Sequence, residues 1–315
     1  MVDKYVKECI FYMCLKSMFS AKDMTLGSPW KRIMEFSIPM LIGNVAQQLY
    51  NTADSVIVGK FVGDDALSAV GSAMPILNLL LALFVGVSTG AGIVVSQSYG
   101  ARDREGLTKA IGNCIALSVL ASLVIMVIGP LVTMPLLTLL GTDPTIIDWC
   151  AEYLNIYFLG IAGFFFYNML SGVLRGLGDS VSALGFLLLA AALNVGLDLW
   201  FVRSMGVAGV SLATVIAQAI SAVFCYIKLL KMRDLFDLNF KTMKPIPSVA
   251  GRILRIGIPS GITQAIMATA GMVVMNLTNA MGKTVVACNV IVMRVDGFAM
   301  MPNMTFGQAM SVYTG

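Results

Sequence analysis

The chain has 315 residues, of which 58% are hydrophobic and only 12% are charged, and its mean hydropathy is +0.85. This composition leaves too little polar surface to cover a soluble globule, so the sequence predicts a membrane protein. The formal charge of +4 comes from basic residues without interleaved aromatics, which argues against nucleic-acid binding. The chain has no histidine, and this removes the commonest general base and metal ligand.

The first 23 residues mix basic and apolar side chains without a long apolar core or a cleavage site, which indicates a cytoplasmic surface segment. Met24 fits as a start as well as Met1 does, because "MTLGSPWKRI" has the basic flank that a first membrane helix needs. Eight uncharged runs follow, and each is close to or above the roughly 20 residues that a spanning helix needs. They are Phe36 to Ala53, Ala66 to Ala101, Ala110 to Thr142, Tyr153 to Leu174, Ser180 to Leu197, Ser204 to Ile227, Ile256 to Gly282 and Gly297 to Gly315.

Basic residues gather at one end of these predicted helices. On that side lie Arg102, Arg104, Lys109, Arg175, Lys228, Lys231, Arg233, Lys241, Lys244, Arg252 and Arg255. The loops on the other side hold only Lys60, Arg203 and Lys283. The positive-inside rule therefore predicts a multi-pass protein of the bacterial inner membrane with a cytoplasmic N-terminus.

A long polar break between Lys228 and Arg255 separates six predicted helices from two. After it, "RILRIGIPSGI" (252–262) matches "KRIMEFSIPMLI" (31–42) at an offset of 220, and "MTFGQAMSVYTG" (304–315) corresponds to "VGVSTGAGIVVS" (85–96) at a similar offset. This pattern indicates a parallel internal repeat of six-helix units. The predicted parts are an N-terminal segment (1–23), an N-lobe with helices 1 to 6 (24–231), an inter-lobe loop (232–250) and the first two helices of a C-lobe (251–315). Because Gly315 falls inside an apolar run, we expect the N-terminal two-thirds of a longer protein.

Only three acidic residues fall within predicted spans, and they are Asp54, Asp198 and Asp296. Asp54 ends a polar stripe on one face of the first helix, at spacings of three and four residues. The stripe consists of Asn44, Gln47, Asn51 and Asp54. A polar face in a membrane helix belongs against protein or water, and intramembrane carboxylates mark functional sites more often than not.

Asn194 and Asp198 lie one turn apart on the fifth predicted helix, which runs in the same direction as the first. Asp54 and Asp198 both lie about 8 Å below the outer ends of their helices, and Thr214 is about 12 Å deep, near Asn194. Two carboxylates at one place cannot both stay ionised without a cation, so the pair holds a proton or binds a metal ion such as Na⁺. The alternative is that each aspartate only hydrogen-bonds a neighbouring helix.

Further candidates are less specific. Tyr153 could hydrogen-bond into the acidic site or belong to an interfacial aromatic belt. Gln47 and Asn51 could face a substrate cavity, and so could Arg294 and Asp296, which lie two residues apart in the eighth predicted helix and point in different directions. A substrate or gating role and a packing role both fit this last pair.

The six cysteines show no CxxC or metal-ligand spacing, so we interpret them as small apolar packing residues. No catalytic constellation supports an intramembrane enzyme. We therefore expect a non-enzymatic protein without an organic cofactor.

Several segments together resemble the multidrug and toxic compound extrusion (MATE) transporters over residues 24 to 315. They are "GNVAQQLYNTADSVIVGKFVG" (43–63), "SQSYGA" (96–101), "LRGLGD" (174–179), "LNVGLDLWFV" (193–202) and "GVAGVSLATVIAQ" (206–218). The resemblance implies two six-helix lobes and export of cationic or amphipathic compounds by alternating access, driven by proton or sodium entry.

The resemblance also implies a cation site at Asp54, Asn194, Asp198 and Thr214, with Tyr153 as an aromatic neighbour. One branch of the family has a glutamate in the seventh helix, at a position that is Met267 here. The repeat counterpart of Asp54 is Val274. Coupling is therefore expected in the N-lobe.

The sequence thus predicts a monomeric, cation-coupled antiporter for amphipathic or cationic small molecules. The second hypothesis is a flippase for a lipid-linked saccharide or another amphiphile, which would need several basic residues in its cavity, and here Arg294 alone qualifies. A third is a membrane scaffold or receptor, which would need no acidic pair. Proton and sodium coupling both remain open, because carboxylate, amide and hydroxyl oxygens serve both ions.

Overall fold

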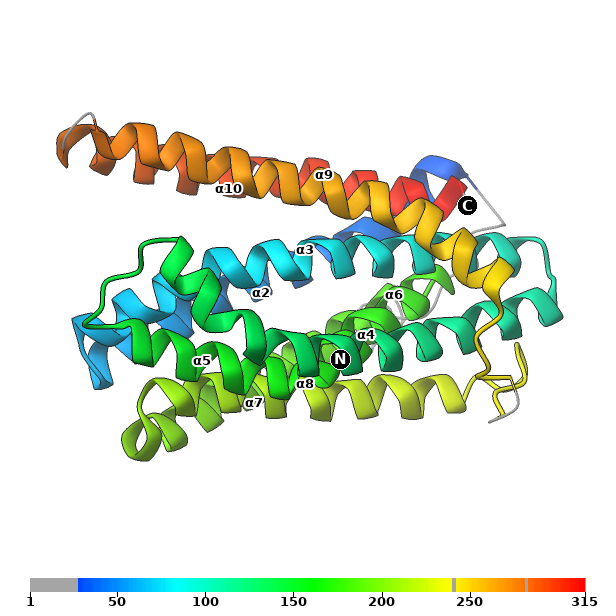
Figure 1. The fold of residues 1–315 in the computed structure, drawn as a ribbon. Coiled ribbons are helices and arrows are strands. Elements are labelled where there is room, and N and C mark those ends of the chain that lie inside the picture. Colours follow the sequence, from blue (N-terminus) through cyan, green and yellow to red (C-terminus); the bar gives the residue numbers. More distant parts are fainter. Residues whose placement is uncertain (1–27, 240–241, 281–282, 315) are drawn as a thin grey trace, which may run out of the picture.

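The computed structural model describes residues 28–239, 242–280 and 283–314, and for part of the stretch 272–294 it describes the backbone alone. In these residues the chain forms nine α-helices and no strand, as Figure 1 shows. The helices are α2 (Pro29–Phe61), α3 (Asp64–Gly100), α4 (Arg104–Leu139), α5 (Ile147–Leu159), α6 (Ile161–Gly176), α7 (Ser180–Met205), α8 (Val207–Leu230), α9 (Pro247–Ala280) and α10 (Lys283–Thr314). The predicted all-helical fold is confirmed. The predicted N-terminal segment (1–23) and Met24 lie outside the described residues.

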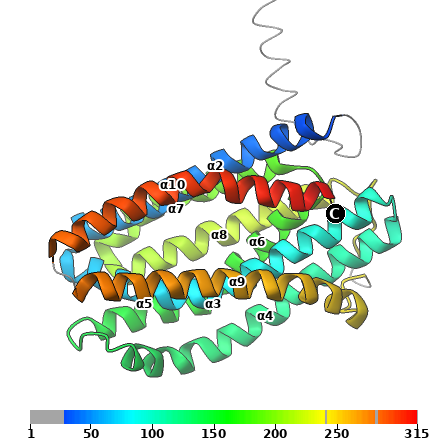
Figure 2. The same cartoon turned by 90° about the horizontal axis from the view of Figure 1, so that it is seen from above.

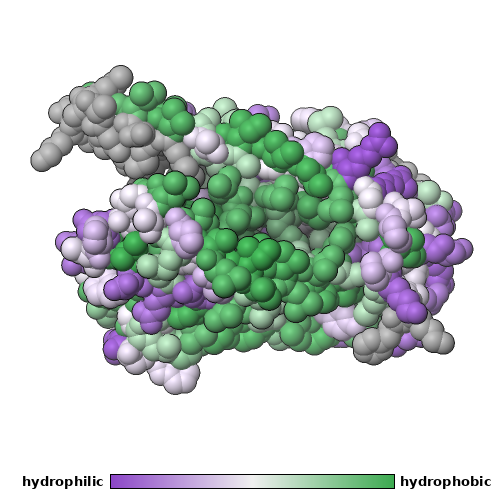
Figure 3. All heavy atoms as spheres, viewed as in Figure 1, coloured by the Kyte–Doolittle hydropathy of each residue, from purple (hydrophilic) through white to green (hydrophobic). Residues whose placement is uncertain are grey.

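Among the described residues, α3, α4, α7 and α8 are long and apolar enough to cross a membrane, and α5 and α6 together make a fifth candidate span. The other three predicted spans correspond to α2, α9 and α10, which contain 33, 34 and 32 residues. At about 1.5 Å per residue each of these is also long enough for the roughly 30 Å hydrocarbon layer. On the face that Figure 3 shows, hydrophobic residues cover the middle of the molecule and hydrophilic residues gather toward its two ends.

Local capping explains where two of the helices begin. The side chain of Asp103 accepts a hydrogen bond of 2.9 Å from the Gly106 N–H at the start of α4. Asp179 accepts one of 2.9 Å from the Ser182 N–H at the start of α7. Both contacts satisfy N–H groups that have no partner inside the helix, and this is why short polar residues precede these apolar runs.

The fourth predicted span (153–174) is broken rather than continuous. α5 and α6 meet at Gly160 with a bend of 53°. A Cβ atom on Gly160 would lie 2.1 Å from Cγ1 of Val215, so only glycine lets α8 approach this closely. The bend between α5 and α6 thus coincides with the close contact with α8. The apolar pattern of the sequence does not reveal this bend.

The helices α2 to α8 form one bundle, and α9 and α10 lie against one side of it (Figures 1 and 2). α9 packs along α3, and α10 packs along α2. The three described cysteines, Cys114, Cys150 and Cys225, are buried free thiols, in agreement with the predicted packing role. Cys9, Cys14 and the side chain of Cys288 lie outside the described part.

Glycine brings the backbones of α3 and α9 together. A Cβ atom on Gly86 would lie 2.2 Å from the Gly261 nitrogen, and one on Gly90 would lie 2.6 Å from the Gly257 nitrogen. Both helices thus present two glycines four residues apart to each other. Small residues at this spacing let membrane helices pack backbone against backbone.

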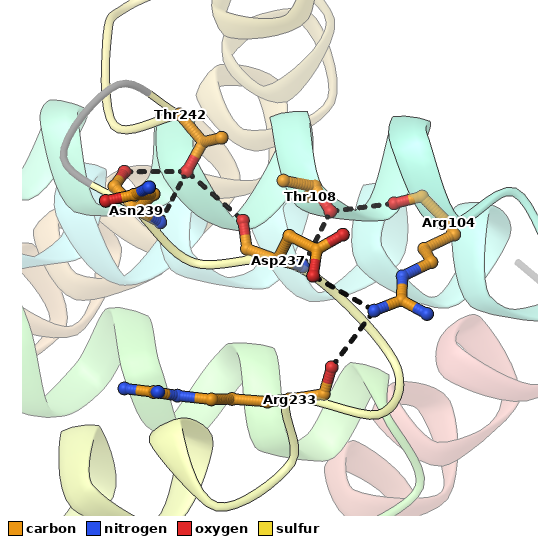
Figure 4. Close-up of polar contacts among 6 residues, drawn as sticks. All are labelled: Arg104, Thr108, Arg233, Asp237, Asn239 and Thr242. Atoms are coloured by element: carbon orange, nitrogen blue, oxygen red, sulfur yellow. Dashed lines mark hydrogen bonds and ion pairs between the residues drawn. The ribbon is translucent and has the colours of Figure 1, made fainter.

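The connecting segment (231–246, of which 240 and 241 are not described) is fixed to the first turns of α4, as Figure 4 shows. Arg104 pairs with Asp237 at 3.0 Å, and the Thr108 hydroxyl accepts a 3.1 Å hydrogen bond from the Asp237 N–H. Phe236 is fully buried. The segment ends where α9 begins at Pro247, four residues before the predicted boundary, because proline suits the first turn of a helix.

The glycine contact predicts a selective effect of one added methyl group. Gly86→Ala should lower the free energy of unfolding by about 1–3 kcal/mol, because the methyl group forces the backbones of α3 and α9 apart. Thermal melting in detergent checks this. The control is Gly71→Ala on the same helix, where an added Cβ meets nothing within 4 Å. This control should melt at the wild-type temperature or slightly above it. Equal melting temperatures for Gly86→Ala and wild type would contradict the contact.

Candidate functional site

A cavity of about 630 Å³ lies between the α2–α8 bundle and α9. Its wall is polar along α2 and α8 and mainly apolar along α3. The polar and aromatic residues that line it include Gln47, Tyr50, Asn51, Asp54, Asn78, Tyr153, Tyr157, Phe164, Thr214, Gln218 and Gln264. The described lining residues include no arginine or lysine. The wall therefore combines carboxylate, amide and aromatic groups without a basic one.

The structure brings Asp54 and Asp198 together at the edge of this cavity. Their carboxyl groups lie next to each other, although they come from α2 and α7. Asp54 is 9% exposed and lines the cavity, whereas Asp198 is completely buried behind it. One oxygen of Asp54 and both oxygens of Asp198 are buried and have no hydrogen-bond partner among the described residues.

Asn194 and Thr214 lie in the same place. The Asn194 Nδ2 donates a 3.1 Å hydrogen bond to the Thr214 hydroxyl, which itself donates to the Val210 carbonyl at 3.1 Å. These bonds leave the Asn194 carbonyl oxygen buried and without a partner in the described residues. The amide is thereby oriented with its donor used and its acceptor free.

Tyrosines complete the surroundings of the acidic pair. Tyr153 is 3% exposed and close to both carboxyl groups, and Tyr157, one turn further along α5, is close to Asp54. Tyr50, one turn before Asp54 on α2, lies near the Thr214 hydroxyl. Tyr50 and Thr214 therefore connect α2 to α8, next to the place where Asp54 and Asp198 connect α2 to α7.

Sequence analysis does not assign roles to Tyr50, Tyr157 or Gln218. Gln218 lies one turn after Thr214 on α8, and its buried side-chain oxygen has no partner among the described residues. All three residues are four positions away from a candidate site residue on the same helix. That spacing is the signal that could have identified them.

The other candidates are more scattered. Gln47 and Asn51 are exposed on the cavity wall, as a substrate role would need. Asn44, from the same stripe, instead donates a 2.9 Å hydrogen bond to the Thr305 hydroxyl of α10. Asp296 is exposed on α10 and does not line this cavity, and the side chain of Arg294 lies outside the described part.

The acidic site is an unusual environment for two carboxylates. At least four oxygens of Asp54, Asn194 and Asp198 are buried without a hydrogen-bond partner in the described residues. A buried charge is stable only when it is paired. The described residues contain no cluster of three His, Cys, Asp or Glu that would suit a transition metal. The acceptor set fits a proton or a hard cation with oxygen ligands.

Comparison with known proteins gives a consistent result. The MatE family model matches residues 39–200. The chain is 31% identical to "Probable multidrug resistance protein YpnP" of Bacillus subtilis over 94% of its own length and 66% of that protein. It is 28% identical to "Probable multidrug resistance protein YoeA" of the same organism, over 91% of this chain and 64% of the relative. The chain thus spans about 64–66% of these two curated relatives.

Solved structures agree with the sequence relatives. An outward-facing multidrug resistance MATE transporter of the MOP superfamily superposes with a TM-score of 0.83 and 29% identity, over 92% of this chain and 65% of that one. A MOP superfamily transporter from Pyrococcus furiosus gives a TM-score of 0.84 and 28% identity over the same shares. These relatives are transporters and not enzymes. The chain is a multi-pass, all-helical membrane protein that belongs to the MATE family.

Proposed function

We propose that the whole protein to which this chain belongs exports amphipathic or cationic small molecules in exchange for an inbound cation. The observation that carries the proposal is the acidic pair of Asp54 and Asp198 beside a large cavity, in which three carboxyl oxygens are buried without a hydrogen-bond partner among the described residues. The names of the relatives, multidrug resistance and multidrug export proteins, support the same activity.

The cation site would use the oxygens of Asp54, Asp198, Asn194 and Thr214. A proton or Na⁺ supplies the positive charge that the pair lacks. Because Tyr50, Asp54 and the cavity-lining Gln47 and Asn51 all belong to α2, a change at the acidic pair acts directly on the cavity wall. A cation can drive export only if it binds the two states of the transporter with different affinity.

We place the basic end of the molecule in the cytoplasm, by the positive-inside rule. The basic end is defined by Arg32, Arg102, Arg104, Lys228, Arg233 and Arg252. The acidic pair then lies nearer the outer surface, so a cation reaches it from outside. Substrate enters from the cytoplasm when the cavity opens toward that side.

The cavity wall favours an exporter of cations over a flippase. A lipid-linked saccharide carries phosphate, which arginine and lysine recognise. The described wall has no basic side chain. Its carboxylate and its aromatic rings suit a cationic, aromatic compound instead. Sensitivity to cationic dyes without a cell-envelope defect on deletion would separate the exporter from the flippase.

Asp54→Asn should abolish cation-coupled export without changing expression, because an amide keeps the shape of the side chain and loses the charge. Ethidium efflux from cells and immunoblotting of the membrane fraction check this. Asp65→Asn, at the exposed start of α3, is the matched control and should export at the wild-type rate. Ethidium efflux that persists in Asp54→Asn would refute the assignment.

Replacing both aspartates by leucine should separate function from stability. Buried charges without donors destabilise a fold, and apolar replacements of buried ionic groups are often neutral or stabilising by about 1–4 kcal/mol. Asp54→Leu/Asp198→Leu should therefore melt at or above the wild-type temperature in detergent and export no ethidium. A lower melting temperature would mean that the aspartates hold neighbouring helices together, and preserved efflux would favour the scaffold hypothesis.

The coupling ion can be identified in proteoliposomes. With the whole protein reconstituted, a sodium gradient and a pH gradient are imposed separately while ethidium transport is recorded. We expect one gradient to drive transport and Asp198→Asn to lose that response, because the carboxylate pair captures the ion. Transport at the same rate without either gradient would contradict coupling.

A further inference from the structure

Two seams join the α2–α8 bundle to α9 and α10. The glycine seam is the contact of α3 with α9, and the side-chain seam is the contact of α2 with α10 (Figure 2). The internal repeat relates the two, because α9 repeats the sequence of α2 and α10 repeats that of α3. At the offset of 219 that aligns residues 85–96 with 304–315, Gly86 corresponds to Thr305 and Gly90 to Ala309.

The repeat-related positions make opposite kinds of contact. In the glycine seam, Gly86 and Gly90 leave no side chain between the two backbones. At its end, the Arg252 guanidinium of α9 also donates to the Gln97 amide oxygen of α3. The approach of the backbones at Gly86 and Gly90 has no side chains that could rotate away, so this part of the seam separates only when the whole helices move apart. Close packing of the two backbones resists the separation of α3 from α9.

In the side-chain seam, the same two positions carry side chains that form the contact themselves. Thr305 accepts the 2.9 Å hydrogen bond from Asn44. Ala309 packs against Phe36 and Met40 in a small buried cluster that is separate from the main core. The contact consists of this hydrogen bond, three buried side chains and the partly buried Ile33 and Val312, and a single hydrogen bond contributes only about 0.5–1.5 kcal/mol.

The side-chain seam also lies on the route from the large cavity to the basic end. Gln47 borders both the large cavity and a smaller one of about 50 Å³, which Met40, Asn44 and Arg175 line as well. Beyond Met40 and Arg175 a third cavity of about 20 Å³ touches Gln308 of α10. Volumes of this size hold at most a few water molecules. Met40 and its neighbours therefore close the route.

We propose that the side-chain seam is the cytoplasmic gate of the transport path and that the glycine seam is its fixed pivot. Opening breaks the Asn44–Thr305 hydrogen bond and separates Phe36 and Met40 from Ala309, while Gly86 and Gly90 keep their contacts with α9. The nature of the transported compound rests on the proposed function. The side of the membrane that the gate faces rests on the proposed orientation.

A cross-linking experiment tests whether the side-chain seam opens during transport while the glycine seam stays closed. In the whole protein, with every native cysteine replaced by alanine, Asn44→Cys/Thr305→Cys is joined by a short bifunctional methanethiosulfonate. Ethidium efflux should be lost and should return on reduction. The matched pair across the pivot, Gln97→Cys/Arg252→Cys, should keep its efflux when cross-linked. Unchanged efflux in the first pair, or reversible loss in the second, would overturn the proposal.

A labelling experiment decides the question without any substrate. Met40→Cys, in the same cysteine-free background, is exposed to a membrane-impermeant maleimide in inside-out vesicles. Removing the gate hydrogen bond with Thr305→Val should raise the labelling rate about 2–10-fold, as expected for the loss of one such bond. Gln97→Leu removes a hydrogen bond of the pivot and should leave the rate unchanged.

An unchanged rate in Thr305→Val, or an equal rise in Gln97→Leu, would refute the gate even in a protein that exports ethidium. Faster labelling in Thr305→Val alone would support the gate even in a protein that exports no ethidium. The outcome for the gate is therefore distinguishable from the outcome for the proposed function.

Discussion

The carboxyl groups of Asp54 and Asp198 meet where the described residues offer their oxygens almost no donor. Inside a membrane a charge without a partner is costly, and most chains avoid it. The neighbouring Asn194 amide donates to Thr214, and its own carbonyl oxygen is buried without a partner among the described residues. An added positive charge would stabilise this arrangement, and the proposed coupling to a cation depends on that requirement.

The rest of the bundle places that pair beside a cavity. The break at Gly160 divides the fourth span, and α5 carries Tyr153 and Tyr157 to the cavity wall. The polar stripe of α2 supplies Asp54 to the pair and Gln47 and Asn51 to the wall. One helix thus contributes to both the acidic pair and the cavity wall. A helix that serves both can transmit a change from one to the other.

The surroundings of α2, α9 and α10 explain why these three helices are less hydrophobic than the other long helices. They are long enough to cross the hydrocarbon layer, but α2 and α9 line the cavity and α10 packs against α2. Side chains that face water or partner side chains need not be apolar, so these helices are less hydrophobic than α3 or α4.

The sequence by itself determined the helical class, most of the span limits and the faces on which polar residues lie, because the 3.6-residue period and the cost of charges in lipid are local constraints. It placed Asp54 and Asp198 at one depth by counting residues from the helix ends. Only the tertiary structure decided that these two faces meet, that Asn44 turns to Thr305 and away from the pair, and that α5 and α6 bend at Gly160. Those outcomes depend on which helices approach closely, and that depends on single glycines and on packing between segments more than a hundred residues apart.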